Sequence, residues 1–345
     1  MPVYNGGTLL RPAINSILNQ SFADFEFLII DDGSTDGSLE VATSFADPRI
    51  RIESNGRNLG LITTLNRGLD LARGNYIARM DADDIAFPSR LSRQLDFMEA
   101  HSDVGLCGTW YEWESEQGKA IMKPPVDDRL IRFFLIFDTV FAHNTILFRR
   151  KFLDDHHLRY DPEYRHAEDF ELWTRCSRLT RLANVPKVLL RYHYHADNTS
   201  NRHRKEQVRT ADRVRCRYLL DLGLIPTDEE CHIHTDLIQF RFYGDTKDLE
   251  GAAAWLLRLT EAACKTLDLP EQFVLQELSR YWYGACGALA DQGPSVYRLF
   301  RSHPCAKHAK LGYHAKLQAR CMLRKPIPTP TCNRPSVPTS VRKES

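Results

Sequence analysis

Short apolar runs alternate with amphipathic stretches through the N-terminal half of this 345-residue chain. The apolar runs have the length of strands, and the amphipathic stretches repeat their hydrophobic residues at helical spacing. Such alternation predicts an α/β fold in which helices flank a parallel or mixed sheet. The expected strands are 25–30, 50–52, 76–80, 104–110 and 145–148, and the expected helices are 8–20, 37–45, 61–72, 88–101 and 168–179.

The pattern changes at about Arg204, where strand-like runs give way to long helical ones. Helical periodicity covers 208–222, 248–267 and 270–289. The sequence therefore predicts a sheet-containing domain over 1–203 and an appended helical region over 204–325. The final stretch, 326–345, is rich in proline, serine and threonine, a composition that predicts disorder.

Three carboxylates, Asp81, Asp83 and Asp84, lie together at the end of the expected strand 76–80. Like charges this close repel, so the cluster needs a cation or strong hydrogen-bond donors to stay ionised. Oxygen ligands on a short turn suit Mg²⁺ or Mn²⁺, and open α/β sheets bind nucleotides at the carboxyl ends of their strands. Taken alone, an Asp-X-Asp sequence is more often a solvated turn.

Four other short motifs accompany this cluster in a characteristic order. They are P-V-Y-N at 2–5, I-D-D-G-S-T-D at 30–36, N-L-G-L at 58–61 and an E-D pair at 168–169. With M-D-A-D-D at 80–84, the set resembles the family 2 glycosyltransferases over roughly residues 1–200. The resemblance implies a GT-A-like, Rossmann-related fold and a hexosyltransferase-type enzyme. Such an enzyme transfers a sugar with inversion from a nucleotide-activated donor, such as a UDP- or dTDP-sugar.

The resemblance also implies roles for residues at the donor side. Tyr4 and Asn5 would lie near the base and ribose, and Asp32 would accept a hydrogen bond from a pyrimidine imino group. From the residues alone, the segment around Asp32 is equally a strand-end turn that caps the next helix. Asp81 would contact the ribose, and Asp83 would hold the Mn²⁺ or Mg²⁺ ion that bridges the two phosphates.

Two further donor contacts, Asn58 and Arg79, follow from the same resemblance. Many relatives carry arginine where this chain has Leu65, and we expect Arg67 or Arg79 to take its place. Each arginine is equally compatible with a surface or structural ion pair.

Asp169 is the candidate general base. It would take the proton of the acceptor hydroxyl as that oxygen attacks the anomeric carbon from the face opposite the diphosphate, and such a single displacement inverts configuration. Without the other motifs, Glu168 and Asp169 would be explained as acidic residues favoured at a helix N-terminus.

Other polar residues near these motifs have less distinct expectations. We expect Asp84 to cap the helix that follows Pro88. His143 and His166 are candidates for the acceptor side, although a packed or surface histidine is the commoner situation for each.

The chain departs from the family at its N-terminus, where relatives have an apolar strand directly before P-x-Y-N. Here Met1 directly precedes Pro2, so the first strand is expected to be absent and the sheet to be left with unpaired backbone. This keeps open a non-catalytic relative that binds nucleotide sugar or acts as a scaffold. A sugar nucleotidyltransferase is disfavoured because P-V-Y-N-G-G lacks the basic residues of a phosphate loop.

Composition indicates where and on what such an enzyme works. Nine cysteines without a C-x-x-C pair, and no leader or membrane span, predict a cytoplasmic protein with reduced thiols. The family's processive motif, Q-x-x-R-W, is missing from the sequence, which favours single additions over polymer synthesis.

Residues 297–325 carry eight lysines and arginines and no acid. We expect this segment to contact the anionic cytoplasmic face of a membrane and so to bring the active site to a saccharide or lipid-linked saccharide acceptor. A solvated basic face or a nucleic-acid contact is the alternative for the segment.

Overall fold

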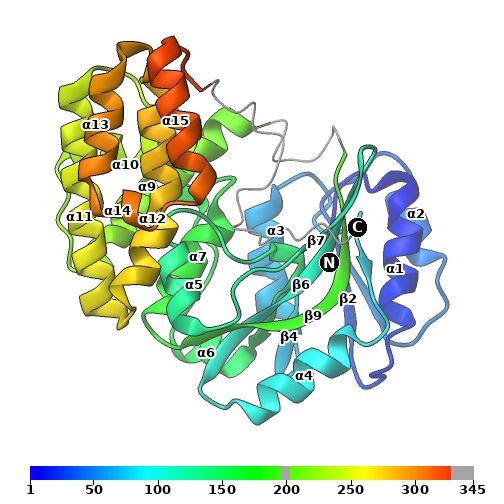
Figure 1. Cartoon of the computed structure of the whole chain (residues 1–345). Helices are drawn as coiled ribbons and strands as arrows, with labels where there is room; N and C mark the ends of the chain where they lie inside the picture. Colours follow the sequence, from blue (N-terminus) through cyan, green and yellow to red (C-terminus); the bar gives the residue numbers. More distant parts are fainter. Residues whose placement is uncertain (196–202, 328–345) are drawn as a thin grey trace. The chain divides into compact units, whose positions relative to one another are not determined.

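The computed structural model describes residues 1–195 and 203–327, which form two compact units (Figure 1). The first unit runs from Met1 to Val214, and the second begins at Arg215. The division comes within helix α9 (Arg204–Asp221), later in the chain than the boundary predicted after residue 203. The first unit is α/β and the second is helical, which confirms the predicted fold class. Of the predicted disordered tail, residues 328–345 lie outside the described part of the chain.

The first unit opens with a small parallel sheet. Its strands, in spatial order, are β1 (Pro2–Val3), β2 (Phe27–Asp31) and β3 (Ile50–Ser54). Successive side chains of β2 point to opposite faces of the sheet. Phe27 and Ile29 pack in one core cluster with Leu10 and Ile14, while Ile30 lies toward the opposite face, beside Gly68.

A short first strand forms from Pro2 and Val3, two residues of the P-V-Y-N motif itself, so this strand position is partly occupied. The expectation about an apolar strand before the motif stays a prediction. Pro2 and Val3 pair in parallel with Ile30 and Asp31. The N-terminal ammonium of Met1 donates a hydrogen bond to the carbonyl of Leu28 at 2.9 Å. The strand forms because the backbone groups of β2 need partners on this side, but it is only two residues long.

A larger mixed sheet completes the first unit. Its strands run in the order β4 (Tyr76–Ala78), β8 (Leu147–Arg149), β6 (Val104–Ser115), β9 (Arg181–His193) and β5 (Ile85–Ala86), with β7 (Gly118–Met122) paired to β6. Strands β6 and β9 are parallel, and the other pairs are antiparallel. The mixed sheet predicted from the sequence is therefore present, as two separate sheets.

Strand β9 was not among the predicted strands. Its sequence contains Pro186, and proline cannot donate to a ladder. The structure accommodates the proline in an irregularity of the pairing with β6. Val185 lies opposite Thr109 and Val188 lies opposite Trp110, so Pro186 and its neighbour are left out of the register. Beyond this bulge the strand continues to His193 and carries its end to the candidate site.

The helices of the first unit flank both sheets (Figure 1). They are α1 (Leu10–Leu18), α2 (Ser38–Thr43), α3 (Leu61–Leu71), α4 (Arg90–Ala100), α5 (Asp128–Phe134), α6 (Arg150–Asp155) and α7 (Glu168–Ser177), with short 3-10 helices η1 (Gly7–Leu9), η2 (His143–Thr145) and η3 (Pro162–Tyr164). Helix α1 contacts α2 and β5, whereas α3 contacts β1 and β2.

A cavity of about 700 Å³ lies between the two sheets. Strand β2 lines it with Leu28 and Ile30, β4 lines it with Ile77, and helices α3 and α4 contribute further apolar side chains. Met1 also borders the cavity, and burial lowers the pKa of its ammonium group to about 5. Neither β1 nor β4 has a strand partner on the side between the two sheets, among the residues that the structure describes.

The second unit is built from helices around buried tryptophans. Its helices after α9 are α10 (Asp228–Gln239), α11 (Thr246–Leu267), α12 (Glu271–Ala288), η4 (Ala290–Gln292), α13 (Pro294–Ser302), α14 (Pro304–Lys307) and α15 (Leu311–Leu323). Trp255 donates to His234 Nδ1 at 3.2 Å, and Trp282 donates to the carbonyl of Phe300 at 3.1 Å. Helices α11 and α12 coincide with the helical periodicity predicted over 248–267 and 270–289. Helices α13 and α15 were not predicted, and they lie mostly in the basic segment 297–325.

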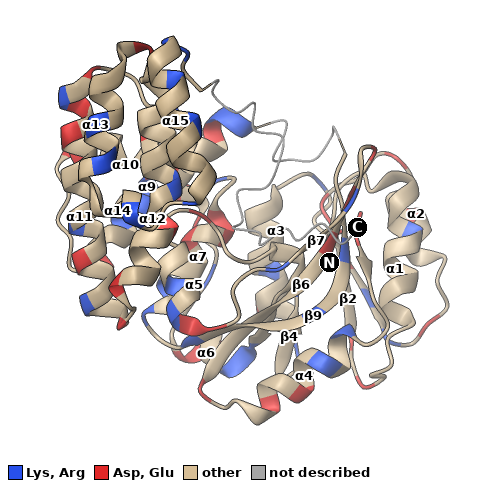
Figure 2. Ribbon diagram, in the orientation of Figure 1, with Lys and Arg blue, Asp and Glu red and all other residues tan. Residues whose placement is uncertain are grey.

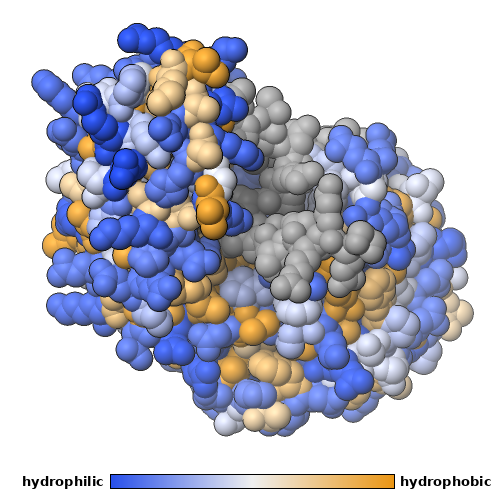
Figure 3. Space-filling model, viewed as in Figure 1, coloured by the Kyte–Doolittle hydropathy of each residue, from blue (hydrophilic) through white to orange (hydrophobic). Residues whose placement is uncertain are grey.

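The surface of this helical unit is mostly polar on the face shown in Figure 3, with a few hydrophobic residues among the hydrophilic ones. Lysines and arginines are spread over its helices (Figure 2). Within the described ranges, the chain has no helix that is both long and apolar enough to cross a bilayer.

Candidate active site

Strands β1 and β2 bring two of the predicted motifs together. Because the strands are parallel, their carboxyl ends meet at one edge of the sheet. Asn5 follows β1 with a left-handed backbone, its Oδ1 accepts a hydrogen bond from the backbone N–H of Thr35 at 2.8 Å, and its own N–H donates to Ser34 Oγ at 3.0 Å. Tyr4 beside it is half exposed. These two residues thus lie on the accessible edge where a nucleotide was expected.

Asp32 is buried at the end of β2 and organises the neighbouring loop. Its carboxylate accepts hydrogen bonds from Asn55 Nδ2 at 2.7 Å and from the backbone N–H groups of Leu59 and Gly60, both at 2.9 Å. Gly33 lies so close to this loop that a Cβ there would be 2.5 Å from the backbone carbon of Arg57. The structure therefore gives Asp32 a positioning role, and its contact with a base remains a prediction.

Asn58 lies in the loop after β3, and Arg67 lies on helix α3 beside that loop; the two residues have different partners. Asn58 is exposed, and its Oδ1 accepts from the N–H of Gly60 at 3.0 Å. Arg67 donates to the carbonyl of Ser54 at 2.8 Å and pairs with Glu53 at 3.0 Å. Arg67 thus holds the loop, which leaves Arg79 as the arginine with a contact to the acidic cluster.

The three carboxylates of the acidic cluster have oxygens within 4.8 Å of one another, but their surroundings differ. Asp84 is fully buried and accepts hydrogen bonds from Asn144 Nδ2 and from the backbone N–H of His193. Burial, with the charges of Asp81 and Asp83, raises its pKa well above the usual range. The expectation that Asp84 caps the helix after Pro88 is wrong, because its carboxylate joins the turn to β9 instead.

Asp83 has about a third of its side chain exposed, nearly as much as Asp81. Its Oδ2 lies 3.2 Å from Nε2 of His195, which follows β9. His195 was not predicted as a site residue, because strand β9 was not predicted. The repeated Tyr-His of residues 192–195, which follows an apolar run, could have indicated polar side chains at a strand end. A carboxylate and an imidazole beside an open surface form a donor set that fits a divalent cation such as Mn²⁺ or Mg²⁺, with substrate phosphates completing the shell.

Arg79 links the acidic cluster to the predicted base. Its guanidinium is buried, is paired with the carboxylate of Asp81, and has an Nε–H for which no described residue is a hydrogen-bond acceptor. Burial raises the pKa of Asp81, and the charge of Arg79 opposes this rise. The same positive charge favours the ionised form of Asp169. One arginine therefore acts electrostatically on the donor-side carboxylate and on the candidate base.

Asp169 lies in the first turn of α7, where its Oδ1 accepts from the N–H of Phe170 at 2.7 Å. Burial raises its pKa to about 6, and burial together with the charge of Asp169 raises the pKa of Glu168 to about 7. A carboxylate whose pKa lies near the working pH is suited to general-base catalysis.

His143 is packed inside the unit, which supports the commoner of its two interpretations. Its Nε2 is 2.7 Å from the hydroxyl of Tyr160, and its ring lies edge-on to Trp173. Burial and the charge of Arg79 lower its pKa well below the usual value, so the ring is neutral.

Comparison with known proteins agrees with this geometry. The family model described as Glycosyl transferase family 2 matches residues 1–158. An uncharacterized glycosyltransferase of Haemophilus influenzae is 34% identical over 224 residues, which cover 61% of this chain and 69% of that protein. The amylovoran biosynthesis glycosyltransferase AmsE of Erwinia amylovora is 32% identical over 203 residues, which cover 56% of this chain and 73% of that protein.

Among solved structures, S. aureus TarS 1–349 in complex with UDP-GlcNAc has a similar fold. The match has a TM-score of 0.55 at 15% identity and covers 92% of this chain and 89% of that one. The chain belongs to the family 2 glycosyltransferases and is a glycosyltransferase enzyme.

Proposed function

We propose that this protein transfers one sugar from a UDP- or dTDP-activated donor to an acceptor hydroxyl, with inversion at the anomeric carbon. The acceptor is a glycan or a lipid-linked saccharide of a polysaccharide pathway, a class suggested by the name of the relative AmsE. The observation that carries the proposal is Arg79, whose charge acts on Asp81 at the donor side and on Asp169 at the acceptor side.

Donor binding is assigned to the edge formed after β1 and β2. Tyr4 and Asn5 border the base and ribose, and Asp32 holds the loop that presents Asn58. A carboxylate has about four acceptor sites, and Asp32 accepts three hydrogen bonds from the protein, so one site is left for the imino group of a pyrimidine base. Asp81, held by Arg79, is assigned to the ribose.

Asp83 and His195 would hold a Mn²⁺ or Mg²⁺ ion. When bound, that ion supplies charge neutralisation for the departing diphosphate. Asp169 accepts the proton from the attacking hydroxyl at a carboxylate oxygen, and its raised pKa makes it a stronger base than a solvent-exposed aspartate.

Little in the structure favours a non-catalytic scaffold. That alternative depended on a missing first strand, and β1 is paired with β2 in the expected parallel sense. The first test is a screen of nucleotide sugars with manganese and with chelator, in which release of the nucleoside diphosphate is measured. Metal-dependent release from one donor would support the proposal, and no release from any donor would contradict it.

The roles of the two aspartates give a sharper test. Asp83→Ala should abolish metal-dependent turnover and weaken binding of the nucleoside diphosphate in calorimetry. Asp169→Asn should leave that binding nearly intact while it lowers turnover by about 10²-fold or more, because a positioned general base contributes about 10² to 10⁴-fold. Equal loss of donor affinity in both variants would show that the separation of roles is wrong.

A further inference from the structure

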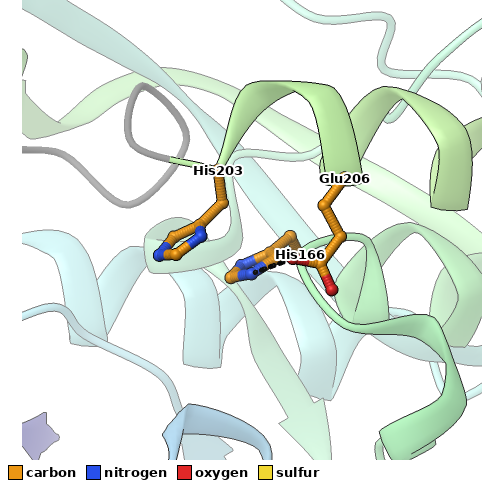
Figure 4. A group of neighbouring side chains, drawn as sticks. All are labelled: His166, His203 and Glu206. Atoms are coloured by element: carbon orange, nitrogen blue, oxygen red, sulfur yellow. Dashed lines mark ion pairs between the residues drawn. The ribbon is translucent and has the colours of Figure 1, made fainter.

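A second group of metal-ligating side chains shares no residue with the acidic cluster and is shown in Figure 4. It consists of His166, in the turn directly before α7, and of His203 and Glu206, at the start of α9. One ligand atom from each of the three lies within 4.8 Å of the other two. All three belong to the first unit. The proposed transfer reaction gives none of them a step, and the acceptor-side role considered for His166 from the sequence stays a prediction.

One pair of this group already has the spacing of two ligands of a bound ion. Nε2 of His166 lies 3.4 Å from Oε2 of Glu206, the spacing of about 3.4 Å expected for two ligands of a tetrahedral ion with bonds of about 2.0 to 2.1 Å. The rings of His166 and His203 are stacked with centroids 4.3 Å apart. His203 and Glu206 are exposed, so their side chains can rotate toward a common centre.

His166 is the fixed point of the group. Its side chain is 9% exposed, and its buried Nε2 has no hydrogen-bond acceptor or donor at ordinary geometry among the described residues. The amide of Gln207 donates to the carbonyl of His166 at 3.1 Å, which holds the start of α9 against this turn.

We propose that His166, His203 and Glu206 form a binding site for a transition-metal ion of the Zn²⁺ class. Two imidazoles and one carboxylate are the donors that Zn²⁺ and Co²⁺ take in proteins, whereas Mg²⁺ prefers oxygen ligands. Three protein ligands leave a fourth position for water. A bound ion joins the turn before α7 to the first turn of α9 and shares no ligand with Asp83 and His195.

The test uses the full chain in an Asp83→Ala background, freed of metal with chelator, so that the acidic cluster contributes little. Zn²⁺ binding is measured by calorimetry, and Co²⁺ binding is measured by its visible absorption. We expect one bound ion. His203→Ala or Glu206→Ala should weaken Zn²⁺ binding by more than about 100-fold, because loss of even an outer-shell partner costs about 10 to 100-fold.

A matched pair on α10 controls for exposed histidines and glutamates in general. Glu229 and His232 are both exposed and have the same three-residue spacing, so Glu229→Ala and His232→Ala should leave Zn²⁺ affinity unchanged. Because the mutated side chains are exposed, the metal-free variants should melt with the parent. Unchanged Zn²⁺ affinity in His203→Ala and Glu206→Ala, or no Zn²⁺ bound by the parent, would overturn the proposal.

Discussion

At the scale of single residues, the candidate site is organised by one buried cation among several carboxylates. Burial raises the pKa of both Asp81 and Asp169, and the charge of Arg79 opposes this rise at both positions. Asp84 is the exception, since it is buried beside two other acids and is satisfied by hydrogen bonds from Asn144 and His193. The cluster therefore contains one structural carboxyl, one ion-paired carboxylate and one accessible ligand, Asp83.

The pKa of Asp169 predicts the acid side of the pH profile. A base acts only when ionised, so kcat/KM should fall about tenfold for each pH unit below a midpoint near 6. Glu168→Gln is the control, because it removes the neighbouring titration but keeps the proposed base. We expect that variant to keep most of its activity and to retain the acid limb. If the limb disappears in Glu168→Gln while activity remains, then Glu168 and not Asp169 controls the profile.

The same shift predicts a stability change. The folded state holds the Asp169 proton more tightly than the unfolded state, so its ionisation lowers the free energy of unfolding as the pH rises from about 4 through about 6. Asp169→Asn removes this cost and should melt above the parent at pH 7.5. At pH 4 the two proteins should melt nearly together. A lower melting temperature of the variant at pH 7.5 would show that the carboxylate is structurally required.

At the scale of elements, the small sheet and the larger sheet are not joined by hydrogen bonds between their end strands, β1 and β4. Strand β1 ends the small sheet and β4 ends the larger one, and the cavity of about 700 Å³ lies between them. The apolar side chains of Leu28, Ile30 and Ile77 line this cavity. The cavity has the apolar lining that an additional strand would cover.

We therefore expect an engineered N-terminal extension to stabilise the protein. About five residues of alternating Val and Ile placed before Met1 would pair with β2 and bury about two side chains, each worth about 1.5 to 3 kcal/mol. The melting temperature should rise by at least about 4 °C, given about 2 to 4 °C per kcal/mol for a unit of this size. An extension of Gly and Ser of equal length is the control. Equal melting temperatures for both extensions would mean that the cavity does not accept a strand.

The buried ammonium of Met1 adds a second readout to that experiment. Its pKa is lowered by burial to about 5, so the unfolded state binds its proton more tightly. The free energy of unfolding of the parent should therefore increase between about pH 5 and pH 8 through this group. Either extension replaces the ammonium with an amide and should remove this part of the pH dependence.

At the scale of the whole molecule, basic residues without acidic partners in sequence are concentrated in the last described helices. The formal net charge of the chain is +1, yet helices α13 to α15 carry basic residues without any acid. Hydrophobic side chains at Leu311, Met322 and Leu323 are exposed on α15 among them. This combination suits an anionic surface, where each basic residue near the lipid contributes about 1 kcal/mol.

Vesicle sedimentation tests this membrane contact. Binding should require anionic lipid, weaken with salt because surface charges are screened, and fall when Arg298, Arg301, Lys316 and Arg320 are changed to Gln. The control variant keeps the charge, because each of the same four arginines and lysines is replaced by the other basic residue (Arg by Lys, and Lys by Arg). It should bind as the parent does. Equal binding to neutral vesicles, or full binding by the Gln variant, would show that the segment is only a solvated basic face.

The sequence by itself determined the alternation of strands and helices, because short apolar runs and helical periodicity are local properties. It also determined the place of Asp81 and Asp83 at a strand end, since both follow directly from β4. Only the tertiary structure decided that Asp32 holds a loop, that Asp84 is a buried acceptor and that His195 meets Asp83. Each of these depends on contacts between residues more than 20 positions apart, made through strand β9 or through the loop after β3. A periodicity read along the chain does not contain such long-range pairings, because they are set by how the strands register.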